Sequence, residues 1–384
     1  MEVYLDNAAT TKCSRRAAEL MMRLLTEEYG NPSSLHTMGI NAEHYIKEAR
    51  KKIAKTLKAE EKEIVFTSGG TEANNLAVFG SAKANKRAGN HIITTEVEHA
   101  SIGQPMQRLE ELGYKVTYLP VDKYGVLDLD ALEEALDEET ILVSIMQVNN
   151  EIGSVQPIAE AAKLIRKKAG HALIHTDAVQ SYGKMAVHPR SLDVDLLSVS
   201  GHKIHGPKGS GFLYIKDKTK IKPILFGGGQ QKGMRSGTEN VPAIAGLGEA
   251  AAEIYENLAA NTKHMYALRR YFIGEAEKME GVTVNGAAGP DAAPHIVSMS
   301  AEGVRSEVLL HALEERGVYV SAGSACSSNK PSVSRTLKAI GLKENLLDAA
   351  VRFSFCENTA KEEVEYAISC MKEIIPFLRK FTRR

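Results

Sequence analysis

The chain has 384 residues, 43% of them hydrophobic and 25% charged, and its 48 Lys and Arg residues balance its 48 Asp and Glu residues. This length exceeds what one compact core usually serves, so we expect more than one domain, and the balanced charge provides no general basic field for nucleic acid or an anionic membrane. The first residues have neither a basic flank nor a long apolar core, and no apolar run reaches about 18 residues, so we expect no signal peptide and no membrane span, and we predict a cytoplasmic protein.

Short apolar runs alternate with segments of helical period between residues 63 and 215. The runs are near-continuously apolar and often β-branched, which is typical of strands buried on both faces of a mainly parallel sheet. One intervening segment, residues 158–170, ends in Gly170, a common helix stop. We therefore predict an α/β sheet with helices on both faces and with ligands at the carboxyl ends of its strands. The seven predicted strands are residues 63–67, 91–95, 115–119, 141–146, 172–176, 196–200 and 211–215.

A loop rich in glycine and polar residues, 226–240, precedes a second set of elements. Residues 242–280 have one long helical pattern, which predicts a connecting helix. Beyond it, strand and helix patterns predict a smaller C-terminal α/β domain. We place the large domain at residues 16–259 and the small domain at residues 260–384, and we expect residues 1–15 to pack with the small domain. The later elements are predicted at residues 295–300 (strand), 306–317 (helix), 349–355 (strand) and from near Ala360 (amphipathic helix).

Polar residues follow several of the predicted strands. The turn at residues 68–71 joins a strand to a helix, where glycines let the backbone approach a ligand and free N–H groups attract an anion. The turn matches neither a Walker A nor a GxGxxG sequence, and an ordinary capped helix start is the alternative. Asp177 ends another strand, where a buried carboxylate needs a partner, although Asp is also a common N-cap residue. His99 and the pair Asn149–Asn150 follow two further strands.

Lys203 follows the strand at residues 196–200, and by itself it could be an ordinary surface lysine. Together, the polar residues that follow the predicted strands favour a cofactor site that includes this lysine. Pyridoxal phosphate needs a lysine for a Schiff base, a carboxylate for its pyridine nitrogen and an anion site for its phosphate. Lys203, Asp177 and the turn at residues 68–71 supply these three groups. His99 and Gln180 could hold the ring, and Ser200 and His202 could add donors to the phosphate.

His202 and His205 also raise the question of a metal site. Gly206 and Pro207 disfavour a sustained helix that would bring the two imidazoles together, and no carboxylate lies close in sequence. We therefore expect no metal.

Four cysteines occur without a CxxC pair, which favours neither a disulfide framework nor a structural zinc site. Cys356 and Cys370 lie in apolar patterns typical of a core. Cys13 lies where a helix start could lower the pKa of its thiol. Small and polar residues surround Cys326, which favours an accessible thiol over a buried one.

Eight motifs together resemble the NifS-like cysteine desulfurases, which are fold-type I pyridoxal-phosphate enzymes related to the class V aminotransferases. The resemblance spans nearly the whole chain. It implies a sulfurtransferase that removes sulfur from L-cysteine, forms L-alanine and leaves a persulfide on Cys326 for an acceptor such as an iron–sulfur scaffold. It also implies a homodimer with shared sites. In order, the motifs are YLDNAATT, GNPSSLH, SGGTEANN, VNNEIG, DAVQ, SGHKIHGPKG, GMRSGTEN and GSACSS.

The resemblance also assigns roles to individual residues. Lys203 would form the Schiff base, and His99 would stack on the ring and move protons. Asp177 would pair with the pyridine nitrogen, Gln180 with the phenolic oxygen, and Arg352 with the substrate carboxylate, a task that suits a planar guanidinium. The remaining assignments are Gly70, Thr71, Ser200 and His202 at the phosphate, Asn150 near cofactor and substrate, and Thr238 at the phosphate of the neighbouring subunit.

Three alternatives remain open at this point. A selenocysteine lyase would use the same residues, and a class V aminotransferase would share the lysine site without needing a cysteine. A non-catalytic scaffold for iron–sulfur assembly would need neither the lysine site nor a cysteine nucleophile. The joint presence of Lys203, Asp177 and His99 disfavours the scaffold.

Overall fold

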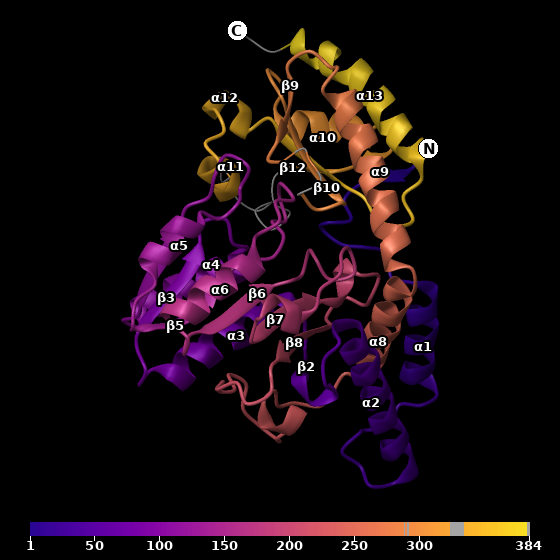
Figure 1. The fold of residues 1–384 in the computed structure, drawn as a ribbon. Helices are drawn as coiled ribbons and strands as arrows, with labels where there is room; N and C mark the ends of the chain where they lie inside the picture. Colours follow the sequence, from indigo (N-terminus) through magenta and orange to yellow (C-terminus); the bar gives the residue numbers. More distant parts are fainter. Residues whose placement is uncertain (288, 290–291, 323–333, 382–384) are drawn as a thin grey trace.

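The computed structural model describes residues 1–287, 289, 292–322 and 334–381, and its centre is a seven-stranded sheet (Figure 1). The strand order is β2-β8-β7-β6-β5-β3-β4; β8 runs antiparallel to both neighbours and the other pairings are parallel. The predicted mainly parallel α/β sheet is thus confirmed. The strands are β2 Ile64–Thr67, β3 His91–Thr95, β4 Lys115–Leu119, β5 Thr140–Ser144, β6 Leu173–Asp177, β7 Leu196–Ser200 and β8 Gly211–Ile215.

Helices cover both faces of this sheet (Figure 1), and the inner strands β5 and β7 are buried along their whole length. This burial explains why their sequences are continuously apolar rather than alternating. The helices and 3₁₀ turns of this part are α1 Arg15–Thr26, α2 Thr37–Leu57, η1 Glu61–Glu63, α3 Gly70–Asn85, α4 Ala100–Glu111, α5 Leu129–Ala135, α6 Ile158–Lys168, α7 Pro189–Leu192, η2 Gly201–Lys203 and η3 Gln231–Gly233.

The connecting helix is two helices, which corrects the prediction of one. α8 spans Val241–Glu256 and α9 spans Leu258–Ala276, and Asn257 between them has φ −128° and ψ 29°. Asparagine competes with the helix by hydrogen bonding through its short side chain, so it is a natural point for the axis to bend.

The C-terminal part is built on a second sheet of four antiparallel strands, in the order β12-β13-β10-β9. The first residues of the chain lie against it, because β1 (Val3–Tyr4) pairs in parallel with β11 (Val318–Tyr319) and Asp6 bridges to Ser354. The domain boundaries themselves stay a prediction. The other elements are β9 Val282–Asn285, β10 Ile296–Ala301, α10 Ser306–Glu314, β12 Ser321–Ala322, α11 Arg335–Ala339, α12 Glu344–Leu347, β13 Ala350–Ser354 and α13 Lys361–Arg379.

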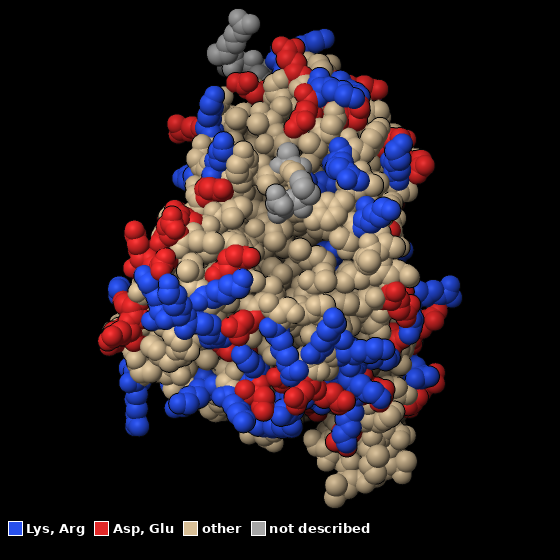
Figure 2. Space-filling view, viewed as in Figure 1, with Lys and Arg blue, Asp and Glu red and all other residues tan. Residues whose placement is uncertain are grey.

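The surface view shows acidic and basic side chains intermixed around the rim and across the lower part of the visible face, whereas its centre carries few charges (Figure 2). The connection between α1 and α2 projects at the lower right, and its end carries no charged side chain in this view. None of the helices within the described residues is long and apolar enough to cross a membrane.

Candidate active site

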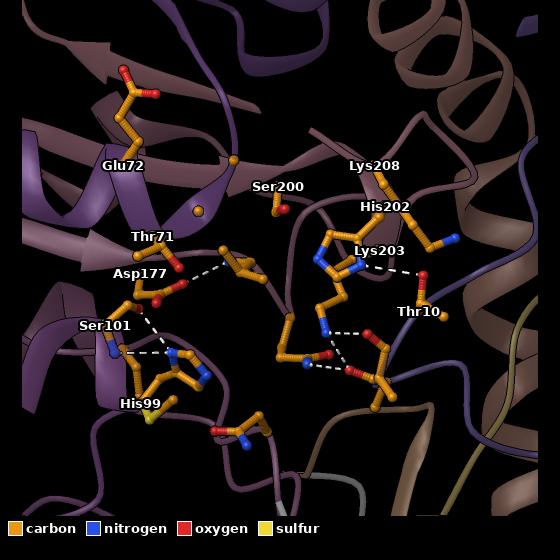
Figure 3. A pocket seen from close by; sticks show the side chains of 18 of the residues that line it. Thr10, Thr71, Glu72, His99, Ser101, Asp177, Ser200, His202, Lys203 and Lys208 are labelled. Atoms are coloured by element: carbon orange, nitrogen blue, oxygen red, sulfur yellow. Dashed lines mark hydrogen bonds between the residues drawn. The ribbon is translucent and has the colours of Figure 1, made fainter. Parts of the chain in front are cut away.

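A cavity of about 520 Å³ opens where β6 and β7 end and α3 begins (Figure 3). This is the carboxyl edge of the sheet, where an α/β fold places its ligands. Residues from seven separate segments of the chain line it. The sequence-predicted residues that line the cavity are Gly70, Thr71, His99, Asn150, Asp177, Gln180, Ser200, His202, Lys203 and Arg352.

Lys203 projects into this cavity from η2, directly after β7 (Figure 3). Its Nζ donates to the carbonyl oxygens of Ala8 at 2.6 Å and Ala9 at 2.7 Å. The N-terminal segment therefore holds the amine at the cavity wall. The sequence reading did not anticipate these two carbonyls, although both lie in the YLDNAATT motif.

Asp177 is the last residue of β6 and is 5% exposed. Its Oδ1 accepts from the backbone N–H of Val179, and its Oδ2 accepts from Asn74 Nδ2 at 2.7 Å. No helix starts at Asp177, so the alternative reading of this residue as an N-cap is wrong. Asn74, fully buried in α3, is a site residue that the sequence reading missed; its only signal was its place in the SGGTEANN motif.

His99 is the N-cap residue of α4, and its ring lies on the cavity wall. Its Nδ1 accepts from the backbone N–H of Ser101 at 3.1 Å, and the Ser101 hydroxyl lies 2.8 Å from the same nitrogen. Because Nδ1 accepts from a backbone donor, a neutral His99 carries its proton on Nε2. The capping contact fixes the ring at the helix start.

The start of α3 forms a narrow, preformed cradle, and the predicted helix start after β2 is confirmed. Gly69, the N-cap residue, has φ +150°, and a Cβ added to Gly70 would lie 2.8 Å from Val179 Cγ2. Free N–H groups at a helix start and the helix dipole together favour an anion there. Thr71 and Ser200 add hydroxyl groups to the same wall.

His202 stands beside this cradle, with its Nδ1 3.2 Å from Thr10 Oγ1. Burial and the nearby charges of Lys203 and Lys208 lower the pKa of His202 to about 4. The imidazole is therefore neutral near pH 7 and can act as a donor without adding a charge to the wall.

Arg352 lies in β13 and brings the C-terminal part to the cavity. It donates to the backbone oxygen of Asn150 at 2.8 Å and pairs with Asp6 Oδ1 at 2.8 Å. Its Nε is buried and has no hydrogen-bond partner within the described residues. Burial raises the pKa of Asp6, although Arg352 acts in the opposite direction. The guanidinium is thus held in place, and its Nε–H group remains available to donate a further hydrogen bond.

Gln180 is oriented from both ends of its amide. Nε2 donates to Ala8 O at 3.0 Å, and His295 Nε2 lies 3.2 Å from Oε1. His295 is 1% exposed and precedes β10, so sequence spacing gave no hint of this contact.

Of the remaining predicted site residues, Thr238 is exposed and does not line the cavity. Cys326 lies outside the residues that the structure describes. Two readings of other cysteines need correction. Cys13 precedes the N-cap Ser14, and burial raises rather than lowers the pKa of its thiol. Cys356 is buried as predicted, but it faces charged groups rather than an apolar core.

Comparison with known proteins gives consistent matches along the whole chain. The family model described as Aminotransferase class-V matches residues 3–367. A protein named Cysteine desulfurase IscS from Dictyoglomus turgidum is 44% identical over 379 residues, which are 98% of this chain and 95% of that protein. A second protein of this name, from Methanosarcina thermophila, is 41% identical and spans 99% of this chain and 93% of its own length.

Solved structures agree with these sequence matches. A structure named NifS-like protein superposes with a TM-score of 0.92 at 38% identity and covers 98% of this chain and 100% of its own. The apo structure of a cysteine desulfurase from Thermococcus onnurineus has a TM-score of 0.89 at 28% identity and covers 98% of this chain and 95% of its own. The chain therefore belongs to the class V aminotransferase family and, within it, to the NifS-like cysteine desulfurases.

Proposed function

We propose that this chain binds pyridoxal phosphate in the cavity and removes sulfur from L-cysteine, forming L-alanine and a persulfide on Cys326. One observation carries the proposal: the Lys203 amine, the Asp177 carboxylate and the start of α3 face one space. These are the groups that pyridoxal phosphate needs for its aldehyde, its pyridine nitrogen and its phosphate. The class of the chain's relatives supports the same activity.

The residues fit the cofactor by their chemistry. A Cβ at Gly70 would collide with Val179, so the start of α3 keeps the close position that forms the cradle only because glycine stands there. Its free N–H groups would hold a phosphate. Thr71, Ser200 and neutral His202 would add donors to that phosphate. Asp177, with one hydrogen bond on each oxygen, remains able to accept another from a ring nitrogen. Gln180 and Asn150 would contact the ring substituents, and His99 would cover one ring face.

When bound, the cofactor would withdraw electrons from the substrate Cα and so stabilise the charge left by loss of the α-proton. Arg352 binds the substrate carboxylate, and its buried Nε supplies a further donor. The amine of Lys203 removes the α-proton. The thiolate of Cys326 then attacks the substrate sulfur: an S–S bond forms while the Cβ–S bond breaks, and its electron pair stays on carbon. One proton added at Cβ and one returned to Cα then give L-alanine.

We also propose a homodimer that shares its two sites. Thr238 is exposed in its own chain, so it is available to a phosphate site in a second copy. Large apolar side chains are exposed along α1, α2 and their connection, a surface that a second copy would cover. The most exposed are Met22 (62%), Leu25 (60%), Tyr29 (68%), Leu35 (95%) and Ile40 (57%).

The sulfur acceptor is proposed to be a protein, such as an iron–sulfur scaffold, in the cytoplasm. An aminotransferase or a selenocysteine lyase would share most of the same residues, so product analysis separates the possibilities. An aminotransferase yields a keto acid, and a selenocysteine lyase discriminates strongly against L-cysteine.

The test compares Cys326→Ser with Cys370→Ser, a substitution of a buried cysteine in α13, away from the cavity. We expect the purified wild type to be yellow and to release alanine and sulfide from L-cysteine. Cys326→Ser should keep the visible absorbance and lose sulfide release by about a hundredfold or more, because the nucleophile is gone. Cys370→Ser should retain activity. A colourless wild type, or normal sulfide release by Cys326→Ser, would overturn the proposal.

A further inference from the structure

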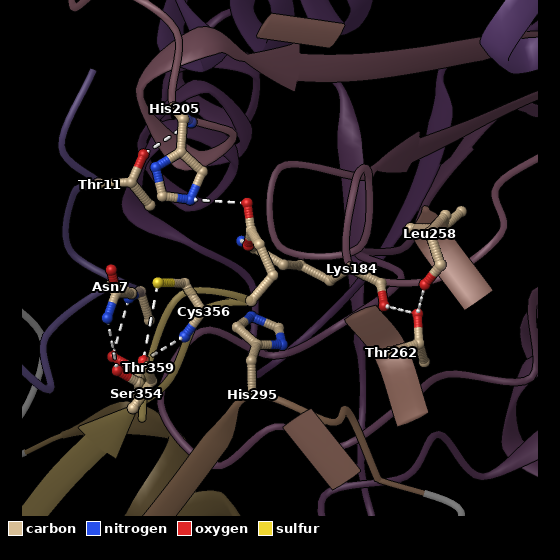
Figure 4. Close-up of polar contacts among 12 residues, drawn as sticks. Asn7, Thr11, Lys184, His205, Leu258, Thr262, His295, Ser354, Cys356 and Thr359 are labelled. Atoms are coloured by element: carbon tan, nitrogen blue, oxygen red, sulfur yellow. Dashed lines mark hydrogen bonds and ion pairs between the residues drawn. The ribbon is translucent and has the colours of Figure 1, made fainter. Parts of the chain in front are cut away.

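Four ionisable side chains meet inside the protein, outside the cavity (Figure 4). Lys184 comes from the turn after β6, His205 from the loop after η2, and Cys356 and Glu357 from the chain just beyond β13. We call Lys184, His205, Cys356 and Glu357 the buried cluster. It joins the seven-stranded part to the C-terminal part, and none of its members lines the cavity.

The contacts within the buried cluster are short. His205 Nε2 lies 3.1 Å from Glu357 Oε1, and Lys184 Nζ lies 3.6 Å from Glu357 Oε2. A ring nitrogen of His205, the sulfur of Cys356 and a carboxylate oxygen of Glu357 all lie within 4.8 Å of one another. The hydroxyl of Thr359 lies 3.6 Å from Cys356 Sγ and can donate to it.

The protonation of His205 follows from its neighbours. Nδ1 lies 2.8 Å from the carbonyl oxygen of Lys12, and a carbonyl only accepts, so Nδ1 carries a proton. Nε2 faces the carboxylate of Glu357, which stabilises a second proton there. His205 is therefore an imidazolium cation, and the buried cluster contains two cations but only one carboxylate.

This excess of positive charge is buried. Lys184 is 2% exposed and Cys356 is 7% exposed, and Lys184 Nζ has no hydrogen-bond partner within the described residues. An uncompensated charge at a buried position destabilises the folded state, whereas one more anion would make the buried cluster electrically neutral. The remaining ionisable group of the buried cluster is the thiol of Cys356, which lies within 4.8 Å of His205 and feels the charge of Lys184.

We propose that Cys356 is a second thiolate of this chain at neutral pH, held between His205 and Lys184 and sealed from solvent. Burial alone raises the pKa of a thiol, but the His205 contact and the Lys184 charge outweigh it, and the pKa of Cys356 is lowered. Two further ionisable groups lie near the buried cluster within the described residues. Burial raises the pKa of Tyr4 in β1, so its phenol stays neutral. Burial and the charge of Lys184 hold the pKa of His295 well below its ordinary value, so its imidazole is neutral as well.

The buried cluster also positions the catalytic lysine. His205 is two residues beyond Lys203, and its backbone N–H donates to Thr11 Oγ1 at 2.7 Å while its carbonyl accepts from Ser14 N at 2.8 Å. The same N-terminal segment supplies the carbonyls of Ala8 and Ala9 that hold Lys203 Nζ. His205 is thus a positioning residue, whatever reaction the cavity carries out.

The test measures thiolate directly, through its ultraviolet absorbance as pH is varied. The parent is Cys326→Ser, which removes the proposed nucleophile, and all proteins are first dialysed against a chelator. We expect a further substitution Cys356→Ser to remove about one thiolate per chain at neutral pH. Cys370→Ser, a matched change of a buried cysteine elsewhere, should remove none.

A second pair of variants tests the cause. His205→Gln and Lys184→Met each remove one cation, so the Cys356 thiolate should appear only at higher pH. Either variant suffices if the other fails to fold. The proposal is wrong if Cys356→Ser leaves the neutral-pH absorbance unchanged, or if chelation abolishes that absorbance, because a metal ion would then be what stabilises the thiolate. None of these readouts depends on desulfurase activity, so the two proposals fail separately.

Discussion

At the scale of single residues, the carboxylate of Asp177 depends on a partner from another element. Asn74 Nδ2 donates to it across 103 positions of sequence. The location of Lys203, Asp177 and His99 at the cavity was predictable, because each lies at or just beyond the carboxyl end of a strand of the main sheet. The supporting residues Asn74 and His295 were not predictable, because their roles exist only through long-range contacts that sequence spacing does not encode.

Asn74→Ala tests this support. The change removes a hydrogen bond to a buried charge, a contact of about 1.5–3 kcal/mol, so cofactor affinity should fall by about tenfold or more. The effect is measured as the rate of cofactor release on dilution, which is monitored by the loss of visible absorbance. Asn85→Ala, at the far end of α3, provides the control and should leave release unchanged. Equal release from both variants would exclude a supporting role for Asn74.

The buried cluster makes stability depend on pH. Burial opposes the charged form of His205, but contacts with Cys356 and Glu357 raise its pKa to about 9. A raised folded-state pKa gives stability that is fully present below the unfolded value and lost as pH rises through about 9. For Glu357, burial is outweighed mainly by His205, and the pKa falls to about 2. The stability that the Glu357 carboxylate contributes is lost as pH falls through about 2.

We therefore expect the Tm of the wild type to fall by several degrees as pH rises through about 9. His205→Gln should have a lower Tm at neutral pH and a flatter profile across this range, because it has no imidazolium to lose. Calorimetry of both proteins at a series of pH values measures the difference. Parallel profiles would contradict the assignment of this transition to His205.

At the scale of elements, the seven strands of the main sheet were predicted within a residue or two, because strands buried on both faces must be continuously apolar. The break at Asn257 between α8 and α9 was missed, since a helical pattern continues across it. The start of α3 was predicted from its glycines, and the structure adds the reason: a Cβ at Gly70 would meet Val179.

Gly70→Ala should therefore displace the start of α3. Overpacking of this kind costs about 1–3 kcal/mol, so we expect cofactor affinity to fall by about tenfold. Gly274→Ala, in α9 where an added Cβ meets nothing within 4 Å, should leave affinity unchanged and stability equal or slightly higher. Titration of the apoprotein with pyridoxal phosphate distinguishes the two variants, and unchanged affinity in Gly70→Ala would contradict the cradle.

At the scale of the whole molecule, the site is complete only where distant parts of the chain meet. Lys203 and Asp177 come from the main sheet, Ala8 and Ala9 from the N-terminal segment, and Arg352 from the second sheet. The fold class followed from sequence pattern, whereas this meeting of segments did not, because no local pattern records which segments pair. A second copy is proposed to complete the site further, through Thr238.

The proposed dimer gives a direct test. Leu35 is 95% exposed in the connection between α1 and α2, so Leu35→Glu should bury a charge in the interface and raise the dimer dissociation constant by about tenfold or more. Leu112→Glu changes an exposed leucine next to α4 and should leave the dimer intact. Light scattering over a range of concentrations measures both. A monomeric wild type would overturn the dimer.

The pairing of β1 with β11 has a consequence for the order of events during synthesis. Val3 reaches its partner Val318 only after more than three hundred further residues have left the ribosome. Until then, contacts such as those of Gln180 Nε2 with Ala8 O and of the His205 N–H with Thr11 Oγ1 can hold the N-terminal segment near Lys203, but its pairing with the C-terminal part is missing. The nascent chain can therefore fold its main sheet early, but the N-terminal segment gains its pairing with the C-terminal part only when translation is almost finished.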